Sequence, residues 1–399
     1  MRKQILRWLG AVLLLGVFSP VFSQYTFFTP EESFAIEVSL ENTDLKRLPI
    51  YRNAITSLAV VEDFVVGGTS ANEGMSPFLF VASLKAQEVV TIQDLSEVVP
   101  GQQSIRSGFV KGSEGQLFVG TMPQPQNDGS GHIIVVRTDA SGNLTVADLG
   151  SPIAGEGVYA LTANPARSIL YGITFPSGQF FSFDTNTRTT KIYNELVPQP
   201  EVVHSLEEQY ALTPDDFLGR ALVTDNEGLV YGSLPFGKLF HFDPIKEELK
   251  EIAAELPEVW GRRSLAQVDS WLKTKEGKLY GGNRADGQLF EFNPQTKQIK
   301  NLGKPIMMPG LPGLAQGGDG KIYGIAGGAP GYSHLFSYDP AEGFKDYGNP
   351  QFVMTAPGIE QGIKWRGFQL STIAASADGT YIVMGEGEAL SQLLVFRVP

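Results

Sequence analysis

The stretch Gly237-Lys238-Leu239-Phe240-His241-Phe242-Asp243-Pro244 is written several times along this chain. Clear copies are GQFFSFD at 178–184, GQLFEFNP at 287–294 and SHLFSYDP at 333–340, and a looser copy is GHIIVVRT at 131–138. The last residues of the shared pattern are Arg137, Asp184, Asp243, Asn293 and Asp339. They lie 47, 59, 50 and 46 residues apart, a period that indicates one structural unit repeated along the chain.

Each copy belongs to a longer unit, which is clearest at 220–253. An apolar run at 221–223 ends in the turn 225–228, and a second apolar run follows at 229–232. The repeated stretch is the third run, and a polar fourth run follows at 248–253. Short runs separated by Asx and Gly turns are typical of β-hairpins, so the unit predicts a four-stranded antiparallel sheet. Because the third run is apolar on both faces, we expect this sheet to be covered on both sides.

The second run recurs seven times, at 64–67, 117–120, 170–172, 230–232, 279–281, 322–324 and 381–385. The sequence therefore predicts an all-β protein: a seven-bladed β-propeller of four-stranded antiparallel blades, with six or eight blades as alternatives. The last unit ends with its third run at 393–398. The alternating segment 34–40 is expected to supply the missing strand, so that an N-terminal strand closes the ring.

Residues 1–23 form the expected signal peptide. Arg2, Lys3 and Arg7 precede an apolar run at 8–18, and small residues stand at Val21 and Ser23. We expect a secreted or periplasmic protein without a membrane anchor after signal cleavage. Residues 24–399 are expected to form a single, monomeric propeller domain with insertions near 197–217 and 349–365. The chain has no cysteine, so neither disulfides nor a lipid on cysteine can contribute.

The charge and motif content exclude several function classes. The chain has 43 acidic and 31 basic residues and a formal net charge of −12, which argues against nucleic acid as a partner. It contains no HExxH motif, no GxSxG motif and no phosphate-binding loop. We therefore expect no metal site and no cofactor.

Arginines recur near the predicted starts of first strands: Arg52, Arg106, Arg220, Arg262, Arg263 and Arg366. Arg284 lies in a link between a second and a third strand. In a propeller these positions share one face, so the arginines are expected at one mouth of the ring. Guanidinium groups suit the recognition of carboxylate or sulfate groups. The alternative is that they pair with acidic neighbours such as Glu156, Asp286, Glu360 or Glu386 and fasten the blades.

The candidate ligand-binding residues are Arg52, Arg106, Arg263, Arg284, Arg366, Trp260 and Trp365. The candidate catalytic residues are His132, His334 and Tyr332. His132 and His334 occupy equivalent positions, at the start of the third strand in their units, on the same expected face as the arginines. The alternative for both is a solvated strand end, and burial between blades is the alternative for Trp260 and Trp365.

The recurring YG and GxLFxFDP patterns resemble those of secreted bacterial seven-bladed propellers. This superfamily includes ulvan-type polysaccharide lyases, virginiamycin B lyases and non-catalytic binding propellers. The resemblance implies two functions. One is an exported propeller that binds an anionic glycan or a protein partner at the arginine-rich mouth. The other is a polysaccharide lyase that cleaves a uronate-containing glycan by β-elimination, with arginine neutralising the carboxylate and histidine or tyrosine removing a proton.

Overall fold

A computed structural model of the chain describes residues 25–27, 31–38, 54–113, 115–125, 129–196, 213–257, 266–328, 332–353, 364–366, 369–387 and 392–399. The predicted signal peptide at 1–23 and most of the insertion at 197–217 lie outside the described residues. Within the described part of the chain, no helix is long and apolar enough to cross a membrane.

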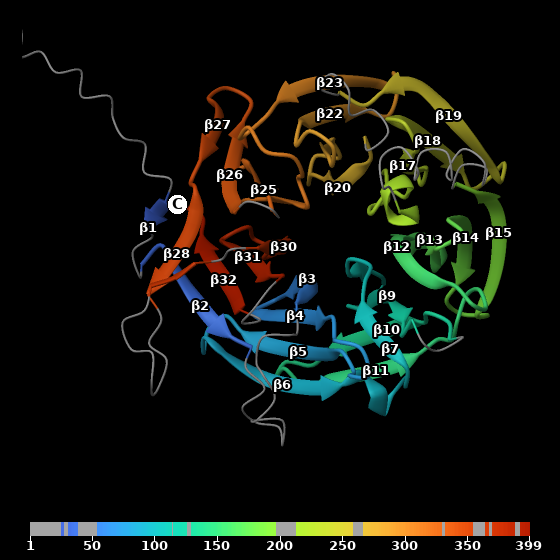
Figure 1. The fold of residues 1–399 in the computed structure, drawn as a ribbon, viewed down its shortest axis with the longest axis horizontal. Coiled ribbons are helices and arrows are strands. Elements are labelled where there is room, and N and C mark those ends of the chain that lie inside the picture. Colours follow the sequence, from blue (N-terminus) through green and yellow to red (C-terminus); the bar gives the residue numbers. More distant parts are fainter. Residues whose placement is uncertain are drawn as a thin grey trace, which may run out of the picture.

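Seven antiparallel sheets surround a central axis, and they follow the chain in order around the ring (Figure 1). Blade 1 comprises β3 (Ile55–Val61), β4 (Phe64–Thr69), β5 (Phe78–Ser83) and β6 (Glu88–Asp94). Blade 2 comprises β7 (Gln102–Ile105), β8 (Val110–Lys111), β9 (Leu117–Pro123), β10 (Ile133–Thr138) and β11 (Leu144–Asp148). Here two short strands, β7 and β8, both pair with β9 and share the innermost position.

The next blades repeat one pattern of four strands. Blade 3 comprises β12 (Gly157–Asn164), β13 (Ile169–Phe175), β14 (Gln179–Asp184) and β15 (Thr189–Glu195). Blade 4 comprises β16 (Val223–Thr224), β17 (Val230–Leu234), β18 (Lys238–Asp243) and β19 (Glu248–Glu255). Blade 5 comprises β20 (Val268–Lys273), β21 (Leu279–Asn283), β22 (Leu289–Asn293) and β23 (Gln298–Gly303). Blade 6 comprises β24 (Gly313–Gln316), β25 (Ile322–Gly327), β26 (Ser333–Asp339) and β27 (Gly343–Asp346).

Blade 7 joins the two ends of the chain. It comprises β30 (Leu370–Ala375), β31 (Tyr381–Glu386), β32 (Gln392–Arg397) and, as its outermost strand, β2 (Ser33–Glu37). Strand β2 runs antiparallel to β32, with Phe34 opposite Val395 and Ile36 opposite Leu393. The predicted seven blades and their closure by an N-terminal strand are therefore confirmed, because β2 supplies the strand that the last repeat lacks.

A small additional sheet lies at the outer edge of the ring beside blades 6 and 7 (Figure 1). It consists of β1 (Tyr25–Phe27), β28 (Asn349–Val353) and β29 (Lys364–Arg366), in the order β1-β28-β29. The sequence analysis treated 349–365 as an insertion and did not predict these strands. The insertion therefore pairs with the N-terminal segment.

The hydrophobic core is divided among the contacts between neighbouring blades. Seven clusters of buried side chains occur in the described chain, one at each junction, including the junction between blades 7 and 1. The phenylalanines of the repeated third strands are 0–1% exposed: Phe183, Phe240, Phe242, Phe290, Phe292 and Phe336. Both faces of each third strand are thus covered, as its two-sided apolar pattern requires.

Pairs of glycine and phenylalanine explain the recurring YG and LFxF letters. Gly281 lies opposite Phe290, and a Cβ atom on Gly281 would lie 2.2 Å from the Phe290 ring. The other such pairs are Gly67–Phe80, Gly172–Phe181, Gly232–Phe240 and Gly324–Phe336. Blades 2 and 7 instead place Val119 opposite Ile134 and Met384 opposite Leu394. The missing side chain on one strand thus makes room for the large ring on the other, so the two positions vary together.

The Asp or Asn that ends each clear copy caps the next hairpin. Asp243 Oδ1 accepts hydrogen bonds from the main-chain amides of Ile245 at 2.9 Å and Lys246 at 3.2 Å. Asp184, Asn293 and Asp339 bind the corresponding amides in blades 3, 5 and 6. These Asx turns fix the link from third to fourth strand, which accounts for the repeated letter.

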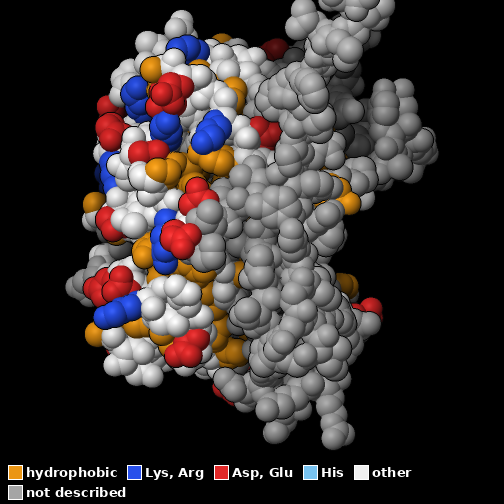
Figure 2. Space-filling view, turned by 90° about the vertical axis from the view of Figure 1, so that its left-hand side faces the viewer, with side chains coloured by type: hydrophobic (Ala, Val, Ile, Leu, Met, Phe, Trp, Pro, Cys, Tyr) orange, Lys and Arg blue, Asp and Glu red, His pale blue; other side chains and the backbone are white. Residues whose placement is uncertain are grey.

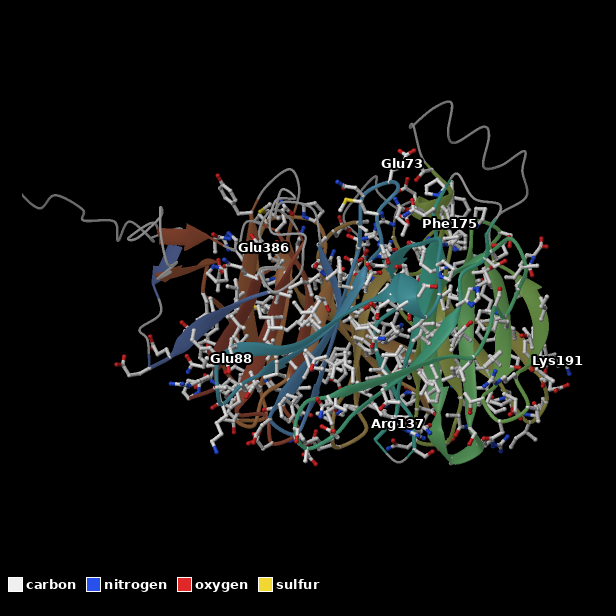
Figure 3. The ribbon with its side chains drawn as sticks, turned by 90° about the horizontal axis from the view of Figure 1, so that it is seen from below. Glu73, Glu88, Arg137, Phe175, Lys191 and Glu386 are labelled. Carbon is white, nitrogen blue, oxygen red and sulfur yellow. The ribbon has the colours of Figure 1, made fainter. Side chains whose placement is uncertain are left out.

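Two faces of the ring can be distinguished. First and third strands begin, and second strands end, at what we call the mouth face. Phe175 and Glu386, which end β13 and β31, lie at this face in Figure 3, whereas Arg137 lies at the opposite face. On the outer side of the ring, acidic and basic side chains are interspersed among apolar ones (Figure 2).

Candidate functional site

A cavity of about 920 Å³ lies at the axis of the ring. Its lining includes residues from the innermost part of every blade, for example Leu58, Lys111, Leu161, Leu222, Trp271, Leu314 and Ile373. The lining side chains from the middle of the first strands are apolar. Successive side chains of a first strand point alternately into the cavity and into the contacts between blades. A volume of this size falls in the range of pockets that bind small molecules.

Four side chains converge on the carboxylate of Asp215 at the mouth face. Arg220 Nη2 lies 2.9 Å from Oδ2, Arg284 Nη2 lies 3.1 Å from Oδ2, and Arg106 Nη2 lies 3.4 Å from Oδ1. The Tyr159 hydroxyl donates to Oδ1. We call these five residues the Asp215 cluster. It joins blades 2, 3, 4 and 5 through one acidic residue.

A short 3-10 helix, η4 (Pro214–Phe217), carries Asp215 to the cavity mouth. The carboxylate of Asp216 accepts from the main-chain amide and the hydroxyl of Thr213, at 2.8 and 3.0 Å, and so fixes the start of the helix. Phe217 and Leu218 are each 1% exposed and anchor its end in the core. Asp215 is therefore held by the packing on one side and by the arginines on the other.

The electrostatics of the Asp215 cluster favour the ionised form of the Asp215 carboxyl. Burial by itself raises the pKa of the Asp215 carboxyl, but the charge of Arg220 and the hydrogen bond from Tyr159 more than reverse this, so the pKa is well below its ordinary value. Burial raises the pKa of the Tyr159 hydroxyl. Arg106 also lies over the Tyr159 ring, 4.9 Å from its centroid.

Basic residues predominate in the cavity. Its described lining contains Arg106, Lys111, Arg220, Lys273 and Arg284 but one acidic residue, Asp269. Asp215 and Asp216 add two carboxylates at the mouth. Lys111 and Lys273 lie opposite Leu117 and Leu279, where second strands begin, and so lie toward the opposite face. The described cavity thus has five basic and three acidic side chains. The three carboxylates match the three arginines in number, so the excess positive charge is that of Lys111 and Lys273, in a chain whose formal net charge is −12.

Some buried polar atoms in the lining have no hydrogen-bond partner. The side chain of Asp269 is 4% exposed, yet its Oδ1 lies 3.8 Å from Arg220 Nη1, too far for a hydrogen bond. Among the described residues, Trp271 Nε1 and Arg220 Nε are also buried without a hydrogen-bond partner. Because buried polar groups are normally satisfied, these atoms mark places where a buried water molecule would complete the hydrogen bonding.

Two of the predicted ligand-binding residues meet in the Asp215 cluster, namely Arg106 and Arg284. Arg220, from the wider set of strand-start arginines, joins them. Arg52, Arg263 and Trp260 lie outside the described residues, while Trp365 and Arg366 form part of β29, whose side chains are not described. The sequence analysis missed Asp215, Tyr159 and Asp269. The run Thr213-Pro214-Asp215-Asp216 is a helix-start signal, but nothing in it predicts an arginine partner.

The candidate catalytic residues are not among the residues that line the cavity. His132 Nδ1 is 3.0 Å from Asp148, and His334 Nδ1 is 3.0 Å from Asp346. Both histidines precede or begin third strands, so they lie at the mouth face but outside the cavity lining. Tyr332 is exposed next to β26. In the described part of the chain, no group of three or more His, Asp or Glu side chains could hold a metal ion.

Both histidine–aspartate pairs have a neutral counterpart in blade 5. There Asn301 Nδ2 donates to Gln288 Oε1, and Gln288 precedes Leu289 as His132 precedes Ile133. In all three blades the fourth-strand Asx accepts from the amide of a glycine two residues on, as in Asp148-Leu149-Gly150 and Asn301-Leu302-Gly303. The recurring Asx-x-Gly letters were the sequence signal for these pairs.

The fold and the cavity define a seven-bladed β-propeller with an axial cavity in which basic side chains outnumber acidic ones. No family model matches the chain, and no curated protein matches its sequence. Solved structures do match. Virginiamycin B lyase from Staphylococcus aureus is 9% identical, with a TM-score of 0.58, and the match covers 92% of this chain and 100% of that one.

Other propellers match about as well. The extracellular domain of a B. thetaiotaomicron protein assigned to the one-component systems is 15% identical, with a TM-score of 0.55; the match covers 91% of this chain and 40% of that one. The Cps50 (Swd1) propeller of Myceliophteria thermophila is 11% identical, with a TM-score of 0.56, and the match covers 87% of this chain and 98% of that one. At these identities the likeness shows the fold alone.

Proposed function

We propose that this chain is a non-catalytic propeller that binds an anionic glycan in its axial cavity. The observation that carries the proposal is the convergence of Arg106, Arg220 and Arg284 at the mouth of a 920 Å³ cavity, with Lys111 and Lys273 toward its other end. Five basic side chains against three carboxylates, Asp215, Asp216 and Asp269, leave an excess of positive charge around the cavity of an acidic chain, and this favours a negatively charged ligand there. The ligand is a glycan that carries carboxylate or sulfate groups.

The geometry also determines how the arginines act. Asp215 already accepts from three guanidinium groups, so part of their charge is compensated within the protein. Asp215, Asp216 and Asp269 are the acidic partners that the ion pairs of Arg106, Arg220 and Arg284 show. In this proposal the arginines fasten blades and keep further N–H donors for a ligand. Lys111 and Lys273 are exposed and complete the positive field.

The cavity favours a glycan over a protein partner. Protein interfaces of standard size bury about 800 Å² on each partner, whereas a concave cavity along the axis of the ring suits an extended, narrow molecule. Trp271 lines the cavity and contributes apolar surface for a sugar to lie against.

A lyase is less well supported. Gln288 and Asn301, which cannot exchange protons at neutral pH, take the place of the histidine–aspartate pairs in blade 5. This favours a structural role for His132 and His334. Tyr159 lies at the cavity mouth, but burial raises the pKa of its hydroxyl, which therefore stays protonated at neutral pH and is not poised to remove a proton.

The test is a titration of the mature protein, residues 24–399, with a panel of glycans followed by calorimetry. Polygalacturonate, alginate and a sulfated glycan are compared with a neutral glucan. The proposal expects binding of at least one anionic glycan that weakens as salt rises, and no binding of the glucan. The same mixtures are followed by absorbance of the unsaturated product of β-elimination. Turnover would support the lyase instead, and equal binding of the neutral glucan would contradict an anion site.

A further inference from the structure

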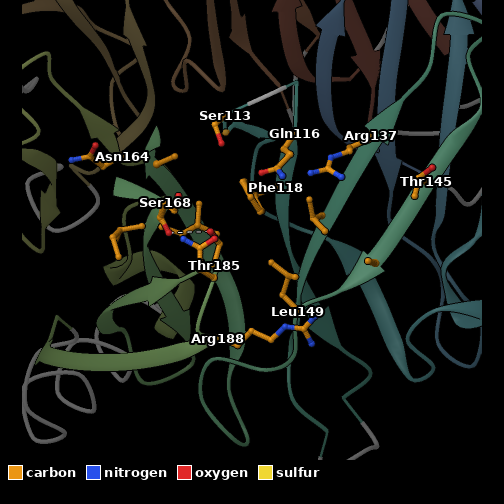
Figure 4. Close-up of a pocket in the computed structure, with 17 residues that line it drawn as sticks. Ser113, Gln116, Phe118, Arg137, Thr145, Leu149, Asn164, Ser168, Thr185 and Arg188 are labelled. Carbon is orange, nitrogen blue, oxygen red and sulfur yellow. Dashed lines mark hydrogen bonds between the residues drawn. The ribbon is translucent and has the colours of Figure 1, made fainter. Parts of the chain in front are cut away.

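A second pocket lies between blades 2 and 3 near the opposite face of the ring. Its volume is about 510 Å³ (Figure 4). Phe118, Val135, Leu149 and Leu170 form its apolar part, and Ser113, Thr145, Ser168 and Thr185 contribute hydroxyl groups. It shares no lining residue with the axial cavity.

Two arginines line this pocket from opposite blades. Arg137 comes from β10 and Arg188 from the turn that follows β14, and Figure 4 shows them on two sides of the pocket. Neither makes an ion pair or a side-chain hydrogen bond with another described residue, and the described lining contains no carboxylate. Glu114, next to Ser113 in the sequence, lies outside the described residues.

The first arginine replaces a turn-capping residue. Leu117 pairs with Val136 as Leu170 pairs with Phe183, so Arg137 occupies the position of Asp184. In blade 2 the hairpin is longer, and Asp139 instead accepts from the amides of Ser141 and Asn143, at 2.8 and 3.0 Å. Arg137 therefore does not cap the turn between the third and fourth strands, as Asp184 does in blade 3.

Arg188 occupies a position whose equivalent in blade 5 carries a side chain that packs into the contact between two blades. Lys297, four residues after Asn293, corresponds to Arg188, four residues after Asp184. Lys297 Nζ lies 2.6 Å from the Tyr231 hydroxyl and 4.6 Å from the centre of its ring, and so closes the space between blades 4 and 5. Between blades 2 and 3, Phe118 takes the place of that tyrosine and offers no hydroxyl. The space therefore stays open, and Arg188 has no ion-pair partner among the residues that the structure describes.

We propose that the pocket between blades 2 and 3 binds a small organic anion. Arg137 and Arg188 would hold its carboxylate, sulfate or phosphate group, and the hydroxyl groups would accept or donate further hydrogen bonds. The apolar body of the ligand would lie against Phe118, Leu149 and Leu170. Two guanidinium groups that line one pocket, with no carboxylate in its described lining, repel each other, and a bound oxyanion relieves that repulsion.

The test uses the mature full-length chain and probes of matched shape. Phenylacetate and phenyl phosphate are compared with neutral phenylacetamide and with inorganic phosphate, by calorimetry at low salt. Binding of the aromatic anions and not of the amide is expected. The double variant Arg137→Ala, Arg188→Ala should weaken binding about tenfold or more, whereas Arg167→Ala, which removes an exposed arginine from the same blade but outside the pocket, should leave it unchanged.

A second variant tests the cavity itself. Ala147 lines the pocket from the exposed edge strand β11, so Ala147→Phe should fill the space and abolish binding without unfolding the chain. The melting temperature of each variant is measured alongside. No binding of either aromatic anion by the wild type would overturn the proposal. So would equal binding by the double variant or by the Ala147→Phe variant. If inorganic phosphate bound as tightly as the aromatic anions, the proposal that the ligand has an apolar body would be overturned.

Discussion

Arg284 and Asp215 are joined twice: Arg284 Nη1 donates to the main-chain carbonyl oxygen of Asp215 at 2.9 Å, and Nη2 lies 3.1 Å from carboxylate Oδ2. A guanidinium that binds both the main chain and the side chain of one residue fixes that residue in place. The link between β21 and β22 thus holds η4 over the cavity mouth, and blade 5 is tied to the connection that leads into blade 4.

Replacing Arg284 tests this tie. Arg284→Ala should lower the free energy of unfolding by about 1–3 kcal/mol, because it removes two charge-assisted hydrogen bonds and leaves Asp215 less compensated. Arg284→Lys should recover only part of the loss, since lysine cannot make both bonds in one plane. Chemical denaturation measures both variants, with Lys85→Ala at an exposed turn as the control. An alanine variant as stable as the control would contradict the role of the cluster in fastening blades.

The acid response of the protein should depend on Asp215. Its pKa is lower in the folded chain than in the unfolded chain, where it is about 4, so the folded state binds this proton less readily. The resulting stabilisation is complete above about pH 4 and is lost as the pH falls further, toward the folded-state pKa. Asp215→Asn should therefore be less stable than the wild type at pH 7, and the difference should shrink below pH 4. Parallel pH profiles for the two proteins would show that Asp215 contributes nothing to this response.

Gly281 and Phe290 should show strong coupling in a double-mutant cycle. Phe290→Ala should cost about 3–5 kcal/mol, from lost burial and the cavity that remains. Gly281→Ala should cost about 1–3 kcal/mol, because its Cβ would overlap the phenylalanine ring. In the Phe290→Ala background the second change should cost almost nothing. Additive costs, measured by urea denaturation, would mean that the ring does not occupy the space above the glycine.

The closing strand should be necessary for a stable ring. Deletion of residues 24–45 removes β2 and exposes the edge of β32, so the truncated chain should aggregate or melt at a clearly lower temperature. Ile36→Asp, which places a charge at a side chain that is 1% exposed, should act in the same direction with the chain intact. Thermal melts that coincide with those of the full-length chain would contradict closure by β2.

The repeated letters determined most of the fold in advance, because each has a local physical cause. Asp243 caps a turn, Phe240 and Phe242 fill the space between blades, and Gly232 makes room for a ring. In blades 2 and 7, the glycines counted as equivalent, Gly120 and Gly385, lie one residue beyond that position. The register differs there because aliphatic pairs replace the glycine–phenylalanine pair.

The candidate site was only partly predictable. Arg106 and Arg284 could be placed at one face because strand starts and links share it. Asp215 could not be found, since it enters from an insertion whose path does not follow the repeat. The small outer sheet was missed for the same reason. Strands β1 and β28 pair in parallel although most of the sequence lies between them, and neither contains the repeated pattern.

The central claim is that the axial cavity binds an anionic glycan, and removal of its two exposed lysines tests this most directly. Lys111 and Lys273 line the cavity and make no part of the Asp215 cluster. We expect the double variant Lys111→Ala, Lys273→Ala to bind the best glycan of the panel about tenfold more weakly than the wild type, with an unchanged melting temperature. Lys85→Ala should bind as the wild type does. Undiminished affinity in the double variant would contradict the proposal that the glycan lies in the cavity.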